Sequence, residues 1–203
     1  MALELYPHNQ KAYASAMEKL RQSGKAAIVH PTGTGKSFIG FCLAEQHPTD
    51  RVLWLTPSEY IVRTQLENLR RASGWEPKNI QFLTYAKLMS LVEEELQTLA
   101  PGWIVLDEFH RCGAEKWGEG VRRLLTQHPE VPLLGLSATN VRYLDNQRDM
   151  AEELFAGQIA SYMTLGEAVV RGILPAPVYV TSVYAYQKEL ARLEERVRGA
   201  RGA

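Results

Sequence analysis

The sequence predicts an α/β fold in which a mostly parallel sheet is covered by helices on both faces. Short apolar runs alternate along the chain with longer segments that have the spacing of amphipathic helices. Glycine and proline residues fall between these segments, where turns are needed. Because parallel strands need long crossover connections, the helices between them cover the sheet.

Ten elements are expected in the first two thirds of the chain, with helices and strands in alternation. Each of the five expected strands is a short apolar run. The expected helices are 8–22, 36–46, 58–72, 84–92 and 115–127. The expected strands are 26–30, 51–56, 79–83, 103–106 and 132–136.

Turn-forming residues support these limits. Gly24 ends the first helix and Pro48 follows the second, while Gly74 and Pro77 separate the third helix from its strand. The strand 103–106 is preceded by a Pro-Gly pair, and two prolines flank the beginning of the strand at 132–136. Each boundary therefore carries its own local signal.

The pattern changes after residue 139. We expect a helix at 146–156 that ends near Gly157, a second at 164–171 and a strand at 177–183. Residues 1–183 would then form one domain. Residues 184–203 would follow as a C-terminal helix over 184–199, either packed on its own domain or connecting to further protein.

Composition fits one globular unit of 203 residues, with 45% hydrophobic residues and equal numbers of basic and acidic residues, 23 each. The two cysteines, Cys42 and Cys112, have no CxxC spacing and are expected to be free thiols. No apolar run is long enough to cross a bilayer, and the N-terminus has no signal-peptide pattern. We therefore expect a cytoplasmic protein with no membrane contact.

A glycine-rich loop lies between the first expected strand and the next helix. A strand that turns through glycines into a helix directs several backbone N–H groups at one point, where a polyphosphate binds. Lys36 would contact the β- and γ-phosphates, and the Ser37 hydroxyl would bind Mg²⁺. The first glycine of the general pattern is replaced by His30. The expected nucleotide-binding residues are Thr32, Gly33, Thr34, Gly35, Lys36 and Ser37.

Two carboxylates follow the apolar strand 103–106. Asp107 and Glu108 would face the same crevice as the phosphate loop, because ligands bind at the carboxyl ends of parallel strands. Asp107 would hold Mg²⁺, and Glu108 would polarise the water that attacks the γ-phosphate. Alone, this motif would read as an acidic turn after a core strand, but the phosphate loop favours the catalytic interpretation. The expected catalytic residues are thus Lys36, Asp107 and Glu108.

These motifs together resemble those of superfamily 2 helicases of the DEAD/DEAH-box type. Asp-Glu-Phe-His at 107–110 resembles the second motif of that family, and Thr-Gly-Thr-Gly-Lys-Ser at 32–37 resembles the first. Other matching segments follow in the family's order, at 5–10, 53–57, 82–86, 136–139 and 167–175. The resemblance spans most of residues 5–180. It implies a RecA-like P-loop NTPase domain that uses ATP and Mg²⁺ and hydrolyses ATP.

The resemblance also implies roles for single residues. Gln10 matches the glutamine that reads adenine, although a surface residue at a helix start would look the same. Ser137 and Thr139, with His110, would sense the nucleotide and pass its state to the nucleic-acid site. The alternative is that the two hydroxyls bond local backbone and that His110 is a core histidine.

Nucleic acid is the partner that the resemblance implies. The matching contact residues are Pro57, Arg63, Gln65 and Thr84. Arg70 and Arg71 are explained as well by the dipole at a helix C-terminus, and the balanced net charge gives no further support. The sequence 107–117 is similar to that of type III restriction subunits and DNA translocases, which favours DNA over RNA.

Such helicases use two motor domains, and no motif after residue 180 could supply the second. We therefore expect a first motor domain, completed by a second RecA-like domain and weakly active alone, because an arginine from the second domain is typically worth about 10³–10⁵ in turnover. Two other functions stay open. The domain could be a nucleotide-dependent switch or scaffold, or the motor of a restriction or nuclease assembly.

Overall fold

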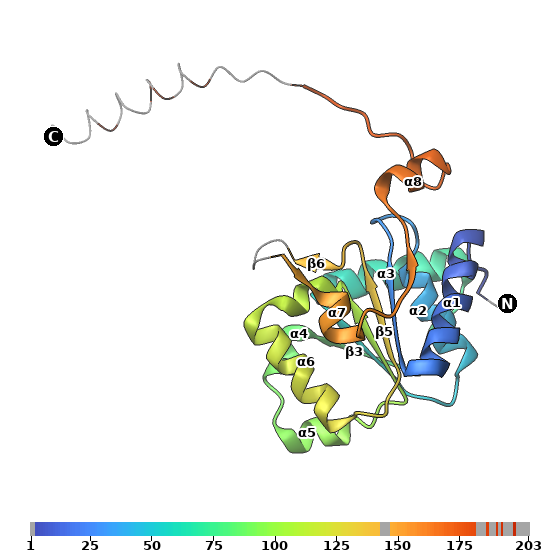
Figure 1. The fold of residues 1–203 in the computed structure, drawn as a ribbon, viewed down its shortest axis with the longest axis vertical. Coiled ribbons are helices and arrows are strands. Elements are labelled where there is room, and N and C mark those ends of the chain that lie inside the picture. Colours follow the sequence, from blue (N-terminus) through green and yellow to red (C-terminus); the bar gives the residue numbers. More distant parts are fainter. Residues whose placement is uncertain are drawn as a thin grey trace.

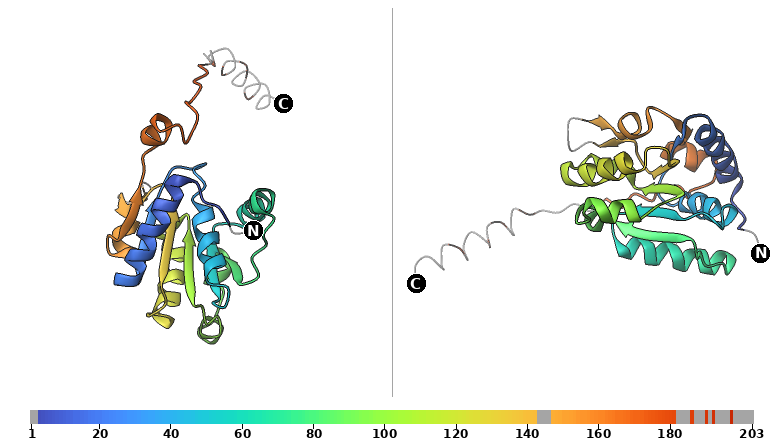
Figure 2. Two further views of the ribbon diagram at one scale, coloured as in Figure 1. Left: turned by 90° about the vertical axis from the view of Figure 1, so that its right-hand side faces the viewer. Right: turned by 90° about the horizontal axis from the view of Figure 1, so that it is seen from below.

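Six parallel strands form a central sheet between two layers of helices (Figures 1 and 2), which confirms the predicted fold class. The structure is a computed structural model and describes residues 3–142 and 147–181, with isolated positions 186, 190, 192 and 197. The strand order is β3-β2-β4-β5-β1-β8. The strands are β1 Lys25–Val29, β2 Val52–Thr56, β3 Ile80–Thr84, β4 Trp103–Asp107, β5 Leu133–Ser137 and β8 Ile159–Tyr162.

Different helices cover the two faces of this sheet. Helices α1 Pro7–Ser23, α2 Ser37–Gln46 and α3 Glu59–Ser73 pack on one face, around Ile28, Trp54 and Leu136. The other face carries α4 Tyr85–Met89, α5 Glu93–Thr98, the 3₁₀ helix η1 Phe109–Gly113, α6 Glu115–Gln127 and α7 Met150–Phe155. Adjacent strand residues alternate between the two cores, as the period of two requires.

Two short elements lie outside the main sheet. Strands β6 Val141–Arg142 and β7 Arg148–Asp149 form an antiparallel pair directly after the segment 136–139, which matches a helicase motif. Helix α8 Leu165–Val170 follows β8 and begins with a capping box, in which Thr164 and Glu167 bond each other's backbone N–H. In Figure 1, α8 stands above the sheet, beyond the ends of the central strands. None of the described helices has a stretch long and apolar enough to cross a bilayer.

The predicted elements up to residue 137 are confirmed apart from the helix at 84–92. That helix ends at Met89, and a separate helix, α5, which the sequence analysis did not predict, begins at Glu93 with Val92 as its N-cap. The break follows from a new cap, because the backbone N–H of Val92 donates to the Glu95 carboxylate. The edge strand β8 was also missed, since its four residues are only partly buried and show no strand alternation.

Two predictions beyond residue 139 need correction. The helix expected at 146–156 is shorter, because Arg148 and Asp149 belong to β7 and the Asp149 carboxylate caps α7 by accepting from two backbone N–H groups. The strand expected at 177–183 does not form over 177–181, where the side chains are exposed. Pro177, the first residue of the expected strand, lacks a backbone donor, and Pro175 lies two residues before it. The rest of that strand, and the helix at 184–199 apart from isolated positions, lie outside the described residues.

Gly135 in β5 marks a point where the core has no room for a side chain. A Cβ atom there would lie 2.3 Å from Phe155 Cζ and 2.9 Å from Phe109 Cδ1. The two rings pack against each other with centroids 5.0 Å apart, so neither can move aside freely.

We predict that Gly135→Ala lowers the free energy of unfolding by about 1–3 kcal/mol, the usual effect of overpacking a core. Urea denaturation of the chain measures it. Gly166→Ala in α8 is the matched control, because a Cβ there meets nothing closer than 4.0 Å. The control should be neutral or slightly stabilising, and equal stability of the two variants would contradict this account of Gly135.

Candidate functional site

Three adjacent strands end at the same edge of the sheet and carry the candidate site. Strand β5 lies between β1 and β4, with Leu136 in register with Ile28 on one side and Asp107 on the other. The phosphate loop follows β1, the acidic motif follows β4 and Ser137 ends β5. Parallel pairing therefore brings three motifs, separated by up to about a hundred residues in sequence, to one place.

The phosphate loop has the geometry that its glycines predict. Gly33 and Gly35 have φ angles of 91° and 78°, which L side chains rarely adopt. Their surroundings are also close, because a Cβ on Gly33 would lie 3.2 Å from Leu174, and one on Gly35 would lie 3.1 Å from Asn9. The chain then enters α2 at Ser37, so that the helix N-terminus faces the loop.

Thr34 fixes the loop from within. Its hydroxyl donates to the Pro31 carbonyl at 2.8 Å. Its own carbonyl accepts from Asn9 Nδ2 at 2.9 Å and lies 2.8 Å from His8 Nε2. The start of α1 is thus bonded to the loop, which is a contact that the sequence analysis did not predict. Thr32, by contrast, is exposed.

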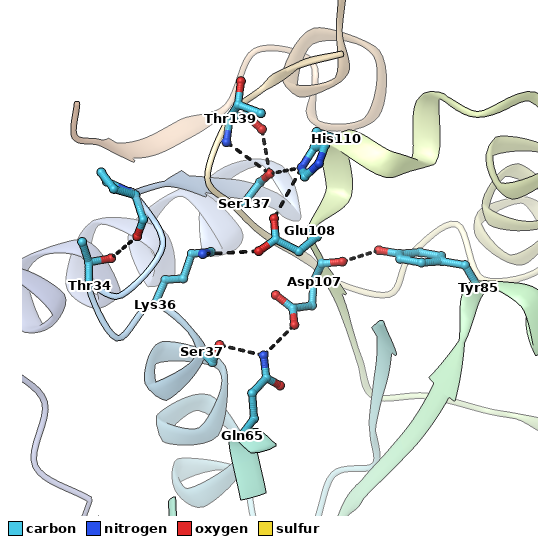
Figure 3. A network of polar contacts seen from close by, with 11 residues as sticks. Thr34, Lys36, Ser37, Gln65, Tyr85, Asp107, Glu108, His110, Ser137 and Thr139 are labelled. Atoms are coloured by element: carbon cyan, nitrogen blue, oxygen red, sulfur yellow. Dashed lines mark hydrogen bonds and ion pairs between the residues drawn. The ribbon is translucent and has the colours of Figure 1, made fainter. Parts of the chain in front are cut away.

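Lys36 and Glu108 form an ion pair at the centre of the site (Figure 3). Lys36 Nζ lies 3.4 Å from Glu108 Oε1, and the lysine is only 7% exposed. Glu108 has a left-handed backbone, with φ 53° and ψ 48°, directly after the last strand residue Asp107. Such a conformation is unusual for a residue with a side chain and costs about 1–3 kcal/mol, so it points to a functional position.

A second chain of contacts runs from Glu108 to the end of β5. His110 Nδ1 lies 3.4 Å from Glu108 Oε2 and 2.7 Å from Ser137 Oγ. The Ser137 hydroxyl donates to the Thr139 carbonyl at 2.7 Å, and Thr139 Oγ1 accepts from the Val141 N–H at 3.1 Å. Burial lowers the pKa of His110 against the raising effect of Glu108. Ser137 thus bonds local backbone and also contacts His110, and its role in sensing the nucleotide stays a prediction.

Ser37 and Asp107, the two expected metal ligands, converge on one point. The Nε2 atom of Gln65 donates to Ser37 Oγ at 2.9 Å and to Asp107 Oδ2 at 2.8 Å. A hydroxyl and a carboxylate oxygen are hard donors of the kind that Mg²⁺ prefers. Burial raises the pKa of Asp107 to about 6, while the Gln65 hydrogen bond lowers it and Glu108 raises it. The backbone carbonyl of Asp107 accepts from the buried Tyr85 hydroxyl at 2.9 Å.

Gln65 was predicted to contact nucleic acid, and in the structure it is bonded to Ser37 and Asp107, the two residues expected to hold Mg²⁺. Three other residues predicted for nucleic acid lie near the ends of β2 and β3. Arg63 and Thr84 line a groove of about 310 Å³, together with Lys87, which the sequence analysis did not single out. Arg63 is exposed and pairs with Glu59 at 3.5 Å. Pro57 is half-buried and does not line that groove.

Gln10 lies beside a second groove, of about 450 Å³, between the N-terminal segment and α2. Its Nε2 atom donates to the Leu5 carbonyl at 2.8 Å, which fixes the amide at the groove wall. Tyr6 is 68% exposed and stacks on His8, with ring centroids 5.9 Å apart. The volume suits a small ligand, but adenine binding by Gln10 stays a prediction.

His30, which stands where the first loop glycine is usual, is fully buried beneath the loop. Its Nε2 atom lies 2.8 Å from Ser161 Oγ on the edge strand β8, and its Nδ1 atom has no partner. Burial and, to a smaller extent, the positive charges of His8, Lys36 and Arg171 together lower the pKa of His30 to about 4. The histidine is thus a neutral link between the loop and the β8 edge, which the sequence analysis did not foresee.

The glycine-rich loop, the helix after it and the two carboxylates on a neighbouring strand define a RecA-like P-loop domain. The family model for DEAD/DEAH box helicases matches residues 7–146. The chain belongs to that family. No curated protein sequence matches it.

Solved helicase structures share this fold. The Hef helicase domain of Pyrococcus furiosus aligns with 85% of this chain at a TM-score of 0.61 and 21% identity. The DEAH/RHA helicase HrpB of Escherichia coli aligns with 77% at 0.60 and 18% identity. The Type ISP restriction-modification enzyme LlaGI, solved with a DNA substrate mimic, aligns with 84% at 0.64 and 18% identity. This chain spans 42%, 22% and 18% of those chains, respectively.

We predict that the buried neutral His30 makes the fold less stable in acid. The unfolded chain takes up a proton near pH 6.5, whereas the folded chain does so only near pH 4. The free energy of unfolding should therefore fall as the pH drops from about 6.5 to 4, with a slope from His30 of at most about 1.4 kcal/mol per pH unit.

Urea denaturation of wild type and His30→Gln at pH 7.5, 6.0 and 5.0 measures this slope. The glutamine keeps a polar group for Ser161 but does not titrate, so its stability should depend less on pH. Parallel pH profiles of the two proteins would show that His30 is not the group responsible.

Proposed function

We propose that this chain is the ATP-binding motor domain of a superfamily 2 DNA helicase or translocase, which couples ATP hydrolysis to movement on nucleic acid. The observation that carries the proposal is the meeting of Lys36, Asp107, Glu108, His110 and Ser137 at the ends of three adjacent strands. Members of the DEAD/DEAH box family are ATPases, and this arrangement gives each step of that reaction a residue of suitable chemistry.

Binding would use the phosphate loop. Its backbone N–H groups and the N-terminus of α2 attract the phosphates, and Lys36 would exchange Glu108 for a phosphate oxygen. Ser37 and Asp107 would hold Mg²⁺, which neutralises charge on the phosphates when bound. Thr32, exposed at the tip of the loop, is free to contact the nucleotide.

Hydrolysis would use Glu108. Its carboxylate is held between Lys36 and His110 and can accept the proton of an attacking water. His110 then links this carboxylate to Ser137 and, through it, to Thr139. A change at the γ-phosphate would thereby reach the segment that follows β5, which is how we propose nucleotide state is passed on.

The track would lie across the ends of β2 and β3. The groove there offers Arg63 and Lys87 for phosphate contacts and Thr84 beside them. We propose DNA rather than RNA, since the sequence after the acidic motif resembles DNA translocases and the similar LlaGI structure holds a DNA mimic. That likeness also favours one specific setting, in which the domain is the motor of a restriction assembly.

A second RecA-like domain, in the same or another chain, would complete the motor. We expect the 203-residue chain alone to bind ATP and to hydrolyse it slowly, because an arginine finger is typically worth about 10³–10⁵ in turnover. Strand separation by this chain without a partner domain would contradict the proposal.

We predict opposite effects on binding for two substitutions. Lys36→Ala should weaken binding of a fluorescent ATP analogue by at least about 100-fold, because the phosphates lose their main cationic partner. Glu108→Gln should bind within about threefold of wild type, because the amide keeps the size of the side chain. Equilibrium titration with Mg²⁺ present measures both, and near-wild-type binding by Lys36→Ala would disprove the assignment of the loop.

We further predict that nucleic acid stimulates hydrolysis. Steady-state ATPase rates of the natural full-length protein, measured with single-stranded DNA, duplex DNA or RNA, should rise about tenfold or more with one DNA form. Glu108→Gln should remove at least about 99% of the rate. ATP binding without stimulation by any polymer would instead support a nucleotide-dependent switch or scaffold.

A further inference from the structure

Gln65 joins the candidate metal ligands to an otherwise weakly attached helix. It lies in α3, on the side of the helix that faces the sheet, one turn before Leu69. Figure 3 shows its side chain reaching from α3 to Ser37 and to the end of β4 at Asp107. One amide group therefore connects three separate elements.

The rest of α3 has few other ties to the body. Leu69 is the helix's one fully buried residue, and it lies in the second half. Among the described residues, the two bonds of Gln65 are the only side-chain hydrogen bonds or ion pairs that join α3 to the phosphate loop or a strand. The first two turns are thus held by the two hydrogen bonds of Gln65 and by partly buried apolar residues, of which Leu66 packs against the core.

These same two turns form one wall of the groove at the ends of β2 and β3. Glu59, Val62 and Arg63 line it, opposite Thr84 and Lys87 from β3 and α4. Any shift of the start of α3 changes the width of that groove. A movement of Gln65 that shifts the start of α3 would therefore also change the surface that we propose for nucleic acid.

The amide also competes with a cation for the same oxygens. The carboxylate of Asp107 only accepts hydrogen bonds, so the NH₂ end of Gln65 must face it. Mg²⁺ needs lone pairs of Ser37 and Asp107, to which Nε2 now donates. The other end of the amide, Oε1, is buried without a partner. An unpaired buried carbonyl oxygen is costly, so reorientation of this side chain regains a hydrogen bond.

We propose that Gln65 is a positioning residue that couples the metal ligands to α3. Binding of Mg²⁺ with a nucleotide displaces its amide from Ser37 and Asp107, releases the first turns of α3 and thereby changes the nucleic-acid groove. The proposal rests on the proposed function, because it assumes that the site binds a Mg²⁺–nucleotide complex.

Nucleotide affinity with and without Mg²⁺ tests the displacement step. Gln65→Met keeps the length of the side chain but has no donor, so the metal no longer competes with an amide. We expect this variant to bind a fluorescent ATP analogue about 3- to 30-fold more tightly than wild type in Mg²⁺, and within about twofold of wild type in EDTA. Unchanged or weaker binding in Mg²⁺ would overturn the proposal.

Asn68→Met is the matched control, since it places the same side chain at an exposed site of the same helix. It should behave as wild type in both titrations. Gln65→Asn, whose shorter amide cannot reach both oxygens, serves as a second variant if Gln65→Met does not fold. It should show the same preference for Mg²⁺, in the same direction.

Hydrogen exchange of wild type tests the movement of α3 without any substitution. Mg²⁺ and nucleotide together should speed exchange in the first turns of α3, within residues 59–66, whereas nucleotide in EDTA should not. In Gln65→Met these turns should exchange rapidly in all conditions. If the exchange rates in these turns do not change with Mg²⁺ and nucleotide, the proposed coupling between the metal ligands and α3 is wrong.

Failure of the proposed function gives a different result. If wild type binds no nucleotide, or if Lys36→Ala binds as well as wild type, then the assignment of the nucleotide site is wrong, and the role proposed for Gln65 is wrong with it. If wild type binds through Lys36 but Gln65→Met gains no Mg²⁺-dependent affinity, then only the role of Gln65 is wrong.

Discussion

The whole site depends on one constraint, the insertion of β5 between β1 and β4 in a parallel sheet. Asp107 and Ile28 both pair with Leu136, so the strands that carry the phosphate loop and the carboxylates end at the same level. A shift of one residue in either pairing would turn each strand's side chains to the opposite face. The close packing of Phe109 and Phe155 against Gly135 resists such a shift, because bulkier residues of β5 cannot take the place of the glycine.

Ion pairs and hydrogen bonds among the site residues allow their charged side chains to be buried. Lys36 is almost fully buried, and a buried ammonium group is stable only beside an anion, which Glu108 supplies. Among the described residues no cation forms an ion pair with Asp107, which is bonded by the neutral Gln65, and burial raises the pKa of this carboxyl group. The two carboxylates therefore differ. Glu108 forms an ion pair with Lys36, whereas Asp107 has no cationic partner within the described part of the chain and its charge would be stabilised most by a bound cation.

The sequence predicted the central elements because their signals are local. The glycines of the loop, the apolar strand before Asp107 and the turn residues each mark a boundary without help from distant residues. Contacts between distant residues could not be predicted in this way. The link from His30 to Ser161 spans 131 positions, and β8 becomes a strand only because β1 offers it an edge. The strand predicted at 177–183 does not form over its described part, 177–181, since no described strand pairs with that segment and Pro177 lacks a backbone donor. Apart from its place on the sheet-facing side of α3, nothing in the sequence predicted that Gln65 would bond Ser37 and Asp107.

Asp107 and Glu108 are neighbours in sequence, yet their contacts leave the site in different directions. Asp107 keeps its strand conformation, and its side chain meets Gln65 and α3. Glu108 turns into the left-handed region, which carries its carboxylate to Lys36 and His110 and so to Ser137. In an extended conformation Glu108 would continue the strand and point to the opposite face of the sheet from Asp107. The strained backbone at one residue therefore lets two adjacent carboxylates lie beside the same phosphate loop while their contacts lead to different parts of the domain, to α3 from Asp107 and to the end of β5 from Glu108.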